Sequence, residues 1–104
     1  MGDTIPISIV REIISEILIE RSNVLMRACE ELMQKEMLEH GTVSDFPMDV
    51  GTESCGTRVL ADEVLYGEIS IEEAVREVLT ADERKEAKYR CRKWLDERKG
   101  IEDR

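Results

Sequence analysis

Aromatic side chains are scarce in this chain of 104 residues and make up only 4% of it. A hydrophobic core therefore has to come from Ile, Val, Leu, Met and Ala. The sequence also contains a single Asn (Asn23) and a single Gln (Gln34) beside abundant Glu, Arg and Lys. This depletion of amides resembles the composition of thermophilic proteins, although five Met and three Cys point the other way.

Close pairs of cysteine or histidine, which most zinc sites contain, are absent. Cys29, Cys55 and Cys91 are widely spaced, and His40 is the only histidine. The Glu-x-x-His motif that carboxylate-bridged di-iron bundles repeat on two helices is absent too. We therefore expect no metal and no cofactor.

Long apolar runs are missing as well. The most apolar stretch, residues 9–19, is interrupted by Arg11, Glu12 and Glu16. A membrane-spanning helix needs about 20 mostly apolar residues, and a signal peptide needs a basic segment before an apolar one. We expect no membrane association and a reducing cytoplasm as the location, where the three thiols stay free.

Acidic residues outnumber basic ones, and the formal net charge is −9. Charged residues make up 38% of the chain and alternate with apolar ones at helical spacing, which favours a folded helical protein over a disordered one. The acidic excess lies mainly in residues 1–57, whereas residues 80–99 carry an excess of Lys and Arg. Overall acidity opposes non-specific binding to nucleic acid. The length predicts one domain, residues 1–104.

The most regular pattern runs through residues 8–40. Apolar residues recur there every three or four positions, which predicts a helix with a broad apolar side, and Gly41 is placed to end it. At about 1.5 Å per residue this helix would be about 48 Å long. A compact domain of this size has a radius of gyration of about 13 Å. The helix must therefore break, or a second copy of the chain must cover the part that protrudes.

A break is favoured near residues 21–23. Ser22 and Asn23 are poor residues for a helix interior, and at a kink Arg21 would extend to solvent. The alternative is a continuous helix in which Arg21 pairs with a carboxylate of another helix or another subunit. In a symmetric dimer, Glu20 or Glu31 of the second copy would supply that carboxylate.

Residues 41–57 lack helical periodicity and contain three glycines, so they are predicted to form a long loop. Phe46 and Met48 would attach this loop to the core. A short helix is predicted at 58–66, ended by Gly67.

Two capping boxes divide the remainder of the chain. Residues 70–73 (Ser-Ile-Glu-Glu) predict the start of a helix at 71–79, and residues 80–83 (Thr-Ala-Asp-Glu) predict another at 81–99, with Gly100 as its end. The buried stripe of the last helix comprises Ala87, Cys91, Trp94 and Leu95. The sequence thus predicts an all-α fold, a small helical bundle with a long N-terminal helix, two short helices and a long C-terminal helix.

The apolar side of the first helix covers roughly 200° of its surface, which is wider than the later helices can cover. We therefore expect a homodimer through this helix and, since no catalytic constellation stands out, a non-enzymatic self-associating protein–protein interaction or regulatory module. The predicted interface residues are Val10, Ile13, Ile14, Ile17, Leu18, Arg21, Val24 and Leu25.

Two other functions stay open. The basic segment 85–93 of the last helix, with Tyr89 and Trp94 nearby, is the element that a nucleic-acid-associated regulator would use, although neighbouring carboxylates balance its charge. A small enzyme centred on the 41–57 loop is the third reading. It would use Cys55, whose thiolate a helix start would stabilise, together with His40 as a base.

Overall fold

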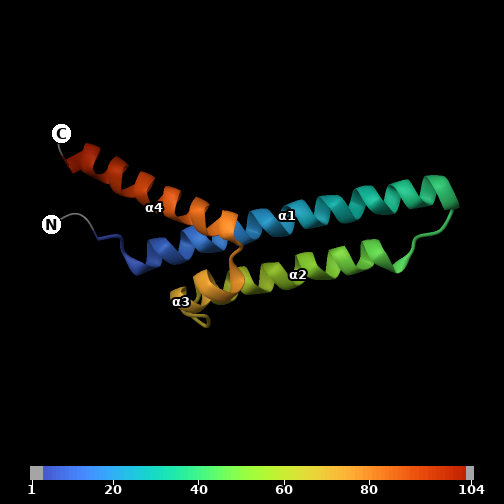
Figure 1. Cartoon of the computed structure of the whole chain (residues 1–104), viewed down its shortest axis with the longest axis horizontal. Helices are drawn as coiled ribbons and strands as arrows, with labels where there is room; N and C mark the ends of the chain where they lie inside the picture. Colours follow the sequence, from blue (N-terminus) through green and yellow to red (C-terminus); the bar gives the residue numbers. More distant parts are fainter. Residues whose placement is uncertain (1–3, 103–104) are drawn as a thin grey trace.

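The structure, a computed structural model, describes the backbone of residues 4–102 and the side chains of residues 4–98. Within this range it consists of helices and contains no strand, so the predicted all-α fold is confirmed (Figure 1). The elements are α1 (Ile7–His40), α2 (Asp45–Leu65), α3 (Ile71–Glu73), the π-helical turn η1 (Ala74–Val78) and α4 (Ala81–Glu102).

The molecule is elongated, with extents of 61 × 29 × 21 Å. Its radius of gyration is 17.7 Å, against about 13 Å for a compact domain of this length. Helices α1 and α2 form a long antiparallel hairpin, and α4 returns along the N-terminal half of α1 only (Figure 1). Within residues 4–102, the other end of the hairpin therefore consists of two helices.

Helix α1 continues through residues 21–23 without a break, so the predicted interruption there is wrong. The reason lies in α2, because Ser22 is buried against Ser54. The Ser22 hydroxyl donates to the Ser54 carbonyl oxygen over 2.9 Å, and the Ser54 hydroxyl donates to the Ser22 carbonyl oxygen over 2.6 Å. A serine whose hydroxyl is bonded to another helix no longer competes for its own backbone.

The predicted loop at 41–57 is also wrong for most of its length. Only residues 41–44 connect the helices, and α2 begins at Asp45. The turn is closed by Glu36, whose carboxylate accepts hydrogen bonds from the Ser44 amide over 2.8 Å and the Ser44 hydroxyl over 2.7 Å. These two bonds lower the pKa of Glu36 below its ordinary value, and the bond from the Ser44 hydroxyl contributes most.

Packing against α1 explains why a glycine-rich segment is helical. A methyl group added to Gly51 would lie 3.2 Å from the Cys29 sulfur, so glycine permits a close approach of the two helices. The hydroxyls of Thr52 and Thr57 donate to carbonyls four residues earlier, over 3.0 and 2.8 Å, as helical backbone allows. The predicted short helix at 58–66 is thus the last part of α2, which ends at Leu65.

The capping box at Thr80 is confirmed, and at Ser70 the serine half of the box forms; the helix predicted at 71–79 is divided into α3 and the π-helical turn η1. The Glu73 amide donates to the Ser70 hydroxyl over 3.1 Å, and the Glu83 amide donates to the Thr80 hydroxyl over 3.2 Å. At the second box the Glu83 carboxylate also accepts from the Thr80 amide over 2.9 Å. These bonds satisfy amides at the starts of α3 and α4. Gly100 does not end α4, which continues to Glu102.

The core lies at the end of the hairpin where α4 adds a third layer. It joins the N-terminal half of α1 to the C-terminal half of α2, and its buried apolar residues are Ile13, Ile14, Ile17, Leu18, Ala61, Val64, Ala74, Leu79 and Ala87. Arg11 donates to the carbonyl oxygens of Val64 and Ile69, both over 2.9 Å. It thereby satisfies one acceptor at the end of α2 and one in the segment that connects α2 to α3.

Candidate functional site

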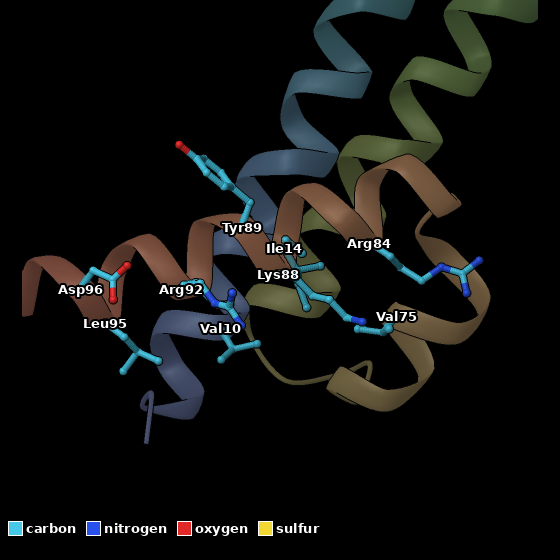
Figure 2. A pocket seen from close by; sticks show the side chains of 11 residues that line it. Val10, Ile14, Val75, Arg84, Lys88, Tyr89, Arg92, Leu95 and Asp96 are labelled. Carbon is cyan, nitrogen blue, oxygen red and sulfur yellow. The ribbon is translucent and has the colours of Figure 1, made fainter. Parts of the chain in front are cut away.

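A groove of about 1060 Å³ lies between the N-terminal part of α1, η1 and the length of α4. Figure 2 shows the side chains that line it. They are Val10, Ile14, Val75, Arg84, Ala87, Lys88, Tyr89, Cys91, Arg92, Leu95 and Asp96. The groove thus joins three segments that are distant in the sequence.

Two stripes on α4 give the groove its chemistry. Ala87, Cys91 and Leu95 recur every four residues and supply apolar surface, which α1 and η1 extend with Val10, Ile14 and Val75. Arg84, Lys88 and Arg92 recur at the same spacing one position further along the helix. In Figure 2, Lys88 reaches from α4 toward Val75, and Arg92 reaches toward Val10. The groove therefore has an apolar floor and a rim with three cations and one carboxylate, that of Asp96, so the rim is cationic on balance.

The rim cations Arg84, Lys88 and Arg92 differ from Arg90, another cation of α4, in their ion pairing. Arg90 is held by Glu86 over 2.8 Å and by Glu20 over 2.7 Å. Among the ion pairs of residues 4–98, none includes Arg84, Lys88 or Arg92. Their charges are thus available to an anionic group that enters the groove.

The Cys91 thiol is half-buried in the floor of the groove. Burial raises the pKa of Cys91, which keeps it a neutral thiol at neutral pH. It acts there as a small apolar group rather than as a nucleophile. No cluster of three or more His, Cys, Asp or Glu side chains that would suit a metal occurs in the described part of the chain. What the lining does offer a ligand is an apolar floor beside three cationic side chains.

Arg21 connects the hairpin to α4 within one chain. Its Nε donates to Glu83 Oε2 over 2.8 Å, its Nη2 donates to the Val78 carbonyl oxygen over 2.9 Å, and its Nη2 also pairs closely with Glu83 Oε1. The continuous-helix alternative is thus the correct one, and the carboxylate comes from another helix. Within one chain, the partner of Arg21 is therefore Glu83 and not the Glu20 or Glu31 of a second copy that the sequence predicted.

The pair is partly shielded from solvent, with side-chain exposures of 25% for Arg21 and 17% for Glu83. Burial raises the pKa of Glu83, but hydrogen bonds from Arg21 and the Thr80 amide, with the charge of Arg21, outweigh it. The net result is a pKa below the ordinary 4.5. The Glu83 carboxylate is therefore ionised at neutral pH and holds α4 to α1.

The arm, which we define as residues 24–55, is the two-helix part of the hairpin beyond Arg21. It exposes large apolar side chains: Val24 (65%), Met37 (55%), Leu38 (88%), Phe46 (60%) and Met48 (59%). Helix α4 starts beside Arg21 and runs toward the N-terminus of α1, away from the arm (Figure 1). No third element of the described chain therefore covers the arm.

The predicted interface residues are divided among the core, the groove, the Arg21–Glu83 pair and the arm. Ile13, Ile14, Ile17 and Leu18 are buried in the chain's own core. Val10 lines the groove, and Arg21 pairs with Glu83. Only Val24 and Leu25 belong to the arm, where Val24 is exposed and Leu25 is half-buried.

His40 and Cys55 are not brought together. His40 is the last residue of α1. Its side chain is exposed, and its Nε2 lies 3.8 Å from Glu39 Oε2. Cys55 is exposed and lies ten residues inside α2, about 15 Å along the helix from its start. The thiol is therefore not at a helix N-terminus, and no loop joins it to His40.

Sequence reasoning found the basic segment 85–93 but missed the groove beside it. The floor depends on Val10 and Val75, whose proximity to α4 is a tertiary property. A usable signal was present in α4 itself, where residues 84, 88 and 92 form a basic row beside the apolar row 87, 91 and 95. Trp94, which the sequence placed near this row, has the Arg98 guanidinium 5.6 Å from its ring centroid.

Comparisons of the chain with models of protein families, with curated proteins and with solved structures found no match. In the part of the chain that the structure describes, no helix combines the length and the apolar content needed to cross a membrane.

Proposed function

We propose that this protein is a non-enzymatic protein–protein interaction module that self-associates through its arm. The observation that carries the proposal is the arm itself, whose two helices expose large apolar side chains and receive no third layer from residues 4–102. Of these side chains, Val24 and Phe46 lie on one side of the arm, and exposed apolar patches mark interaction sites. A pair of helices also has little stability alone, because a two-layer contact buries only one face of each helix.

The face of α1 that meets α4 continues into the arm. Val24, Ala28 and Leu32 follow Arg21 at intervals of three and four residues, so they lie on the side of α1 that Arg21 presents to Glu83. Beyond the first turn of α4 this side has no cover from residues 4–102. These three residues thus continue the apolar side of α1 from the core into the arm.

Helix α2 contributes to the same side of the arm. The pKa of Arg21 is raised first by its hydrogen bond to Glu83 and also by the nearby charge of Glu53. The charge of Glu53 on α2 is thus near enough to act on Arg21 across the hairpin. Phe46 and Val50, seven and three residues before Glu53, share its face of the helix. We define the arm face as Val24, Ala28, Leu32, Phe46 and Val50.

A second copy of the chain is the occupant that fits this face. Two arms placed face to face about a two-fold axis form a four-helix bundle, in which every helix has two neighbours. Antiparallel pairing about Ala28 sets Val24 of each chain opposite Leu32 of the other, and the small Ala28 lets the helices approach at the axis. In this arrangement the dimer still forms through the first helix, but through its C-terminal half.

A cytoplasmic location also belongs to the proposal. Its support is that Cys29, Cys55 and Cys91 are all free thiols.

The native mass, measured by light scattering, tests self-association. We expect twice the 12.0 kDa of one chain for the wild-type protein at about 50 μM, a concentration well above the dissociation constant of a stable dimer. Ala28→Arg places two charged side chains at the axis and should give a monomer. Met37→Arg is the control, because Met37 lies on another side of α1 and its side chain is 55% exposed, whereas Ala28 is half-buried.

A wild-type monomer at this concentration would contradict the proposal. So would a dimer that survives Ala28→Arg but dissociates in Met37→Arg, since the interface would then lie on the other side of the arm.

A further inference from the structure

The groove beside α4 has dimensions that suit a helix. Its lining residues on α4 run from Arg84 to Asp96, which is about 18 Å or somewhat more than three helical turns. The floor offers α4 apolar groups at Ala87, Cys91 and Leu95, one per turn. A helix lying along this floor would meet the groups with apolar residues at positions i, i+4 and i+7, as in other helix-in-groove complexes.

The charge of the rim indicates the chemistry of the occupant. Arg84, Lys88 and Arg92 are spaced by about 6 Å along α4, which is the axial spacing of residues four apart on any helix. A helix with Asp or Glu at such intervals would pair with all three cations while its apolar side fills the floor. The rim is cationic although the chain carries a net charge of −9, so the local sign is opposite to that of the whole protein.

We propose that the groove between α1, η1 and α4 binds an acidic amphipathic helix of a partner protein. This site goes beyond self-association and is separate from the arm face. Docking would pair the rim cations with carboxylates and cover Cys91 and Leu95.

Other occupants match the groove less well. A polynucleotide would use the cations but would leave the apolar floor unfilled, and the acidic remainder of the protein would repel it. A carboxylate-headed acyl chain would fill the floor but would pair with a single cation. The acidic arm of a second copy would bind head to tail, in a contact that does not close into a dimer.

A fluorescein-labelled peptide tests the proposal by fluorescence anisotropy. The peptide is a helix-forming sequence of about 14 residues, long enough to span the groove, with Leu at i, i+4 and i+7 and Glu on both flanks. A second peptide carries Lys in place of each Glu. We expect the acidic peptide to bind the wild-type protein at least tenfold more tightly than the basic one, about 1.4 kcal/mol.

Two double variants of α4 with the same change in net charge locate the site. Lys88→Glu with Arg92→Glu reverses two rim charges and should weaken binding of the acidic peptide at least about tenfold. Lys85→Glu with Lys93→Glu reverses two charges outside the groove and should weaken it by less than about threefold. All four side chains are exposed, so circular dichroism should show both variants folded. The arm variant Ala28→Arg should bind the peptide as the wild type does, which keeps this test independent of self-association.

The proposal is overturned if the acidic peptide does not bind at millimolar concentration, or if both double variants weaken it equally. It is also overturned if single-stranded DNA binds at the rim instead, or an oleate probe displaces the peptide with higher affinity. A native mass above that of the dimer, lost only in the Lys88→Glu, Arg92→Glu protein, would assign the groove to a second copy.

Discussion

The two ends of the α1–α2 hairpin are made by the same pair of helices but differ in burial. At the α4 end, Leu18 and Val64 are fully buried between the hairpin and the segments that follow it. At the arm end, Leu38 and Phe46 are 88% and 60% exposed. The helices are continuous between the two ends, so the difference comes from the third layer and not from helix formation. A helix can therefore be complete in its backbone hydrogen bonds and still lack a cover for one face.

Truncating one leucine at each end should give the largest contrast. Leu18→Ala removes a side chain that is 0% exposed, and we expect it to lower the free energy of unfolding by about 2–5 kcal/mol. Leu38→Ala removes one that is 88% exposed, and a change within about 0.5 kcal/mol is expected. Urea denaturation at equal protein concentration measures both, and similar losses would contradict the division into two regions.

Removing the charge that joins α4 to the hairpin should have a smaller effect. Glu83→Gln is expected to lower the free energy of unfolding at pH 7 by about 1–3 kcal/mol, since it weakens a charged hydrogen bond in a partly buried pair. The folded pKa of Glu83 lies below the ordinary 4.5, so this stabilisation is complete above that pH and is lost as the pH falls through the folded pKa.

Denaturation curves of the wild-type and Glu83→Gln proteins from pH 7 to pH 3 check this dependence. Their difference in stability should shrink below pH 4.5. A constant difference over the whole range would show that the charge of Glu83 contributes nothing.

The glycines of α2 test the helix where the sequence predicted a loop. Gly56 has no atom within 4 Å of an added methyl group, so Gly56→Ala should stabilise the protein by about 0.5–1 kcal/mol. Gly51→Ala should stabilise less, or destabilise, because its methyl group would lie 3.2 Å from the Cys29 sulfur. Thermal denaturation followed by circular dichroism compares the two. No gain from Gly56→Ala would argue against a helix at this point.

Thiol reactivity should distinguish the two regions without changing stability. Cys55 in the arm is exposed, whereas Cys91 is half-buried with a raised pKa and Cys29 is buried. We expect Cys55 to react with a disulfide reagent at least about tenfold faster than Cys91, because the thiolate is the reactive form. Mass spectrometry of partly labelled protein gives the order. Earlier labelling of Cys91 would show that the groove floor opens.

Local signals in the sequence predicted much of the fold. The helix starts at Ser70 and Thr80 follow from hydroxyl and carboxylate groups three residues apart, and in the structure both hydroxyls cap their helices while the reciprocal carboxylate bond forms at Thr80. The end of α1 at Gly41 was predicted from glycine's access to a positive φ, which is 72° there. These features depend on a few neighbouring residues, so one sequence suffices to find them.

Features that depend on packing were not predictable in this way. Ser22 and Gly51 are unfavourable in isolated helices, yet contacts with Ser54 and Cys29 across the hairpin keep both segments helical. The groove needs Val10 beside Leu95, a pairing that no local pattern contains. The site was therefore visible only as a basic row on α4.

Hydrogen exchange of the arm amides, followed by mass spectrometry, tests most directly whether a second copy completes the arm. In the wild-type protein the amides of residues 24–55 should be protected, and in Ala28→Arg they should exchange at least about tenfold faster. Amides of the α4 end, residues 13–18 and 61–64, should be unchanged, and Met37→Arg should behave as the wild type. Equal protection of the arm in all three proteins would show that two helices suffice, and would contradict self-association through this face.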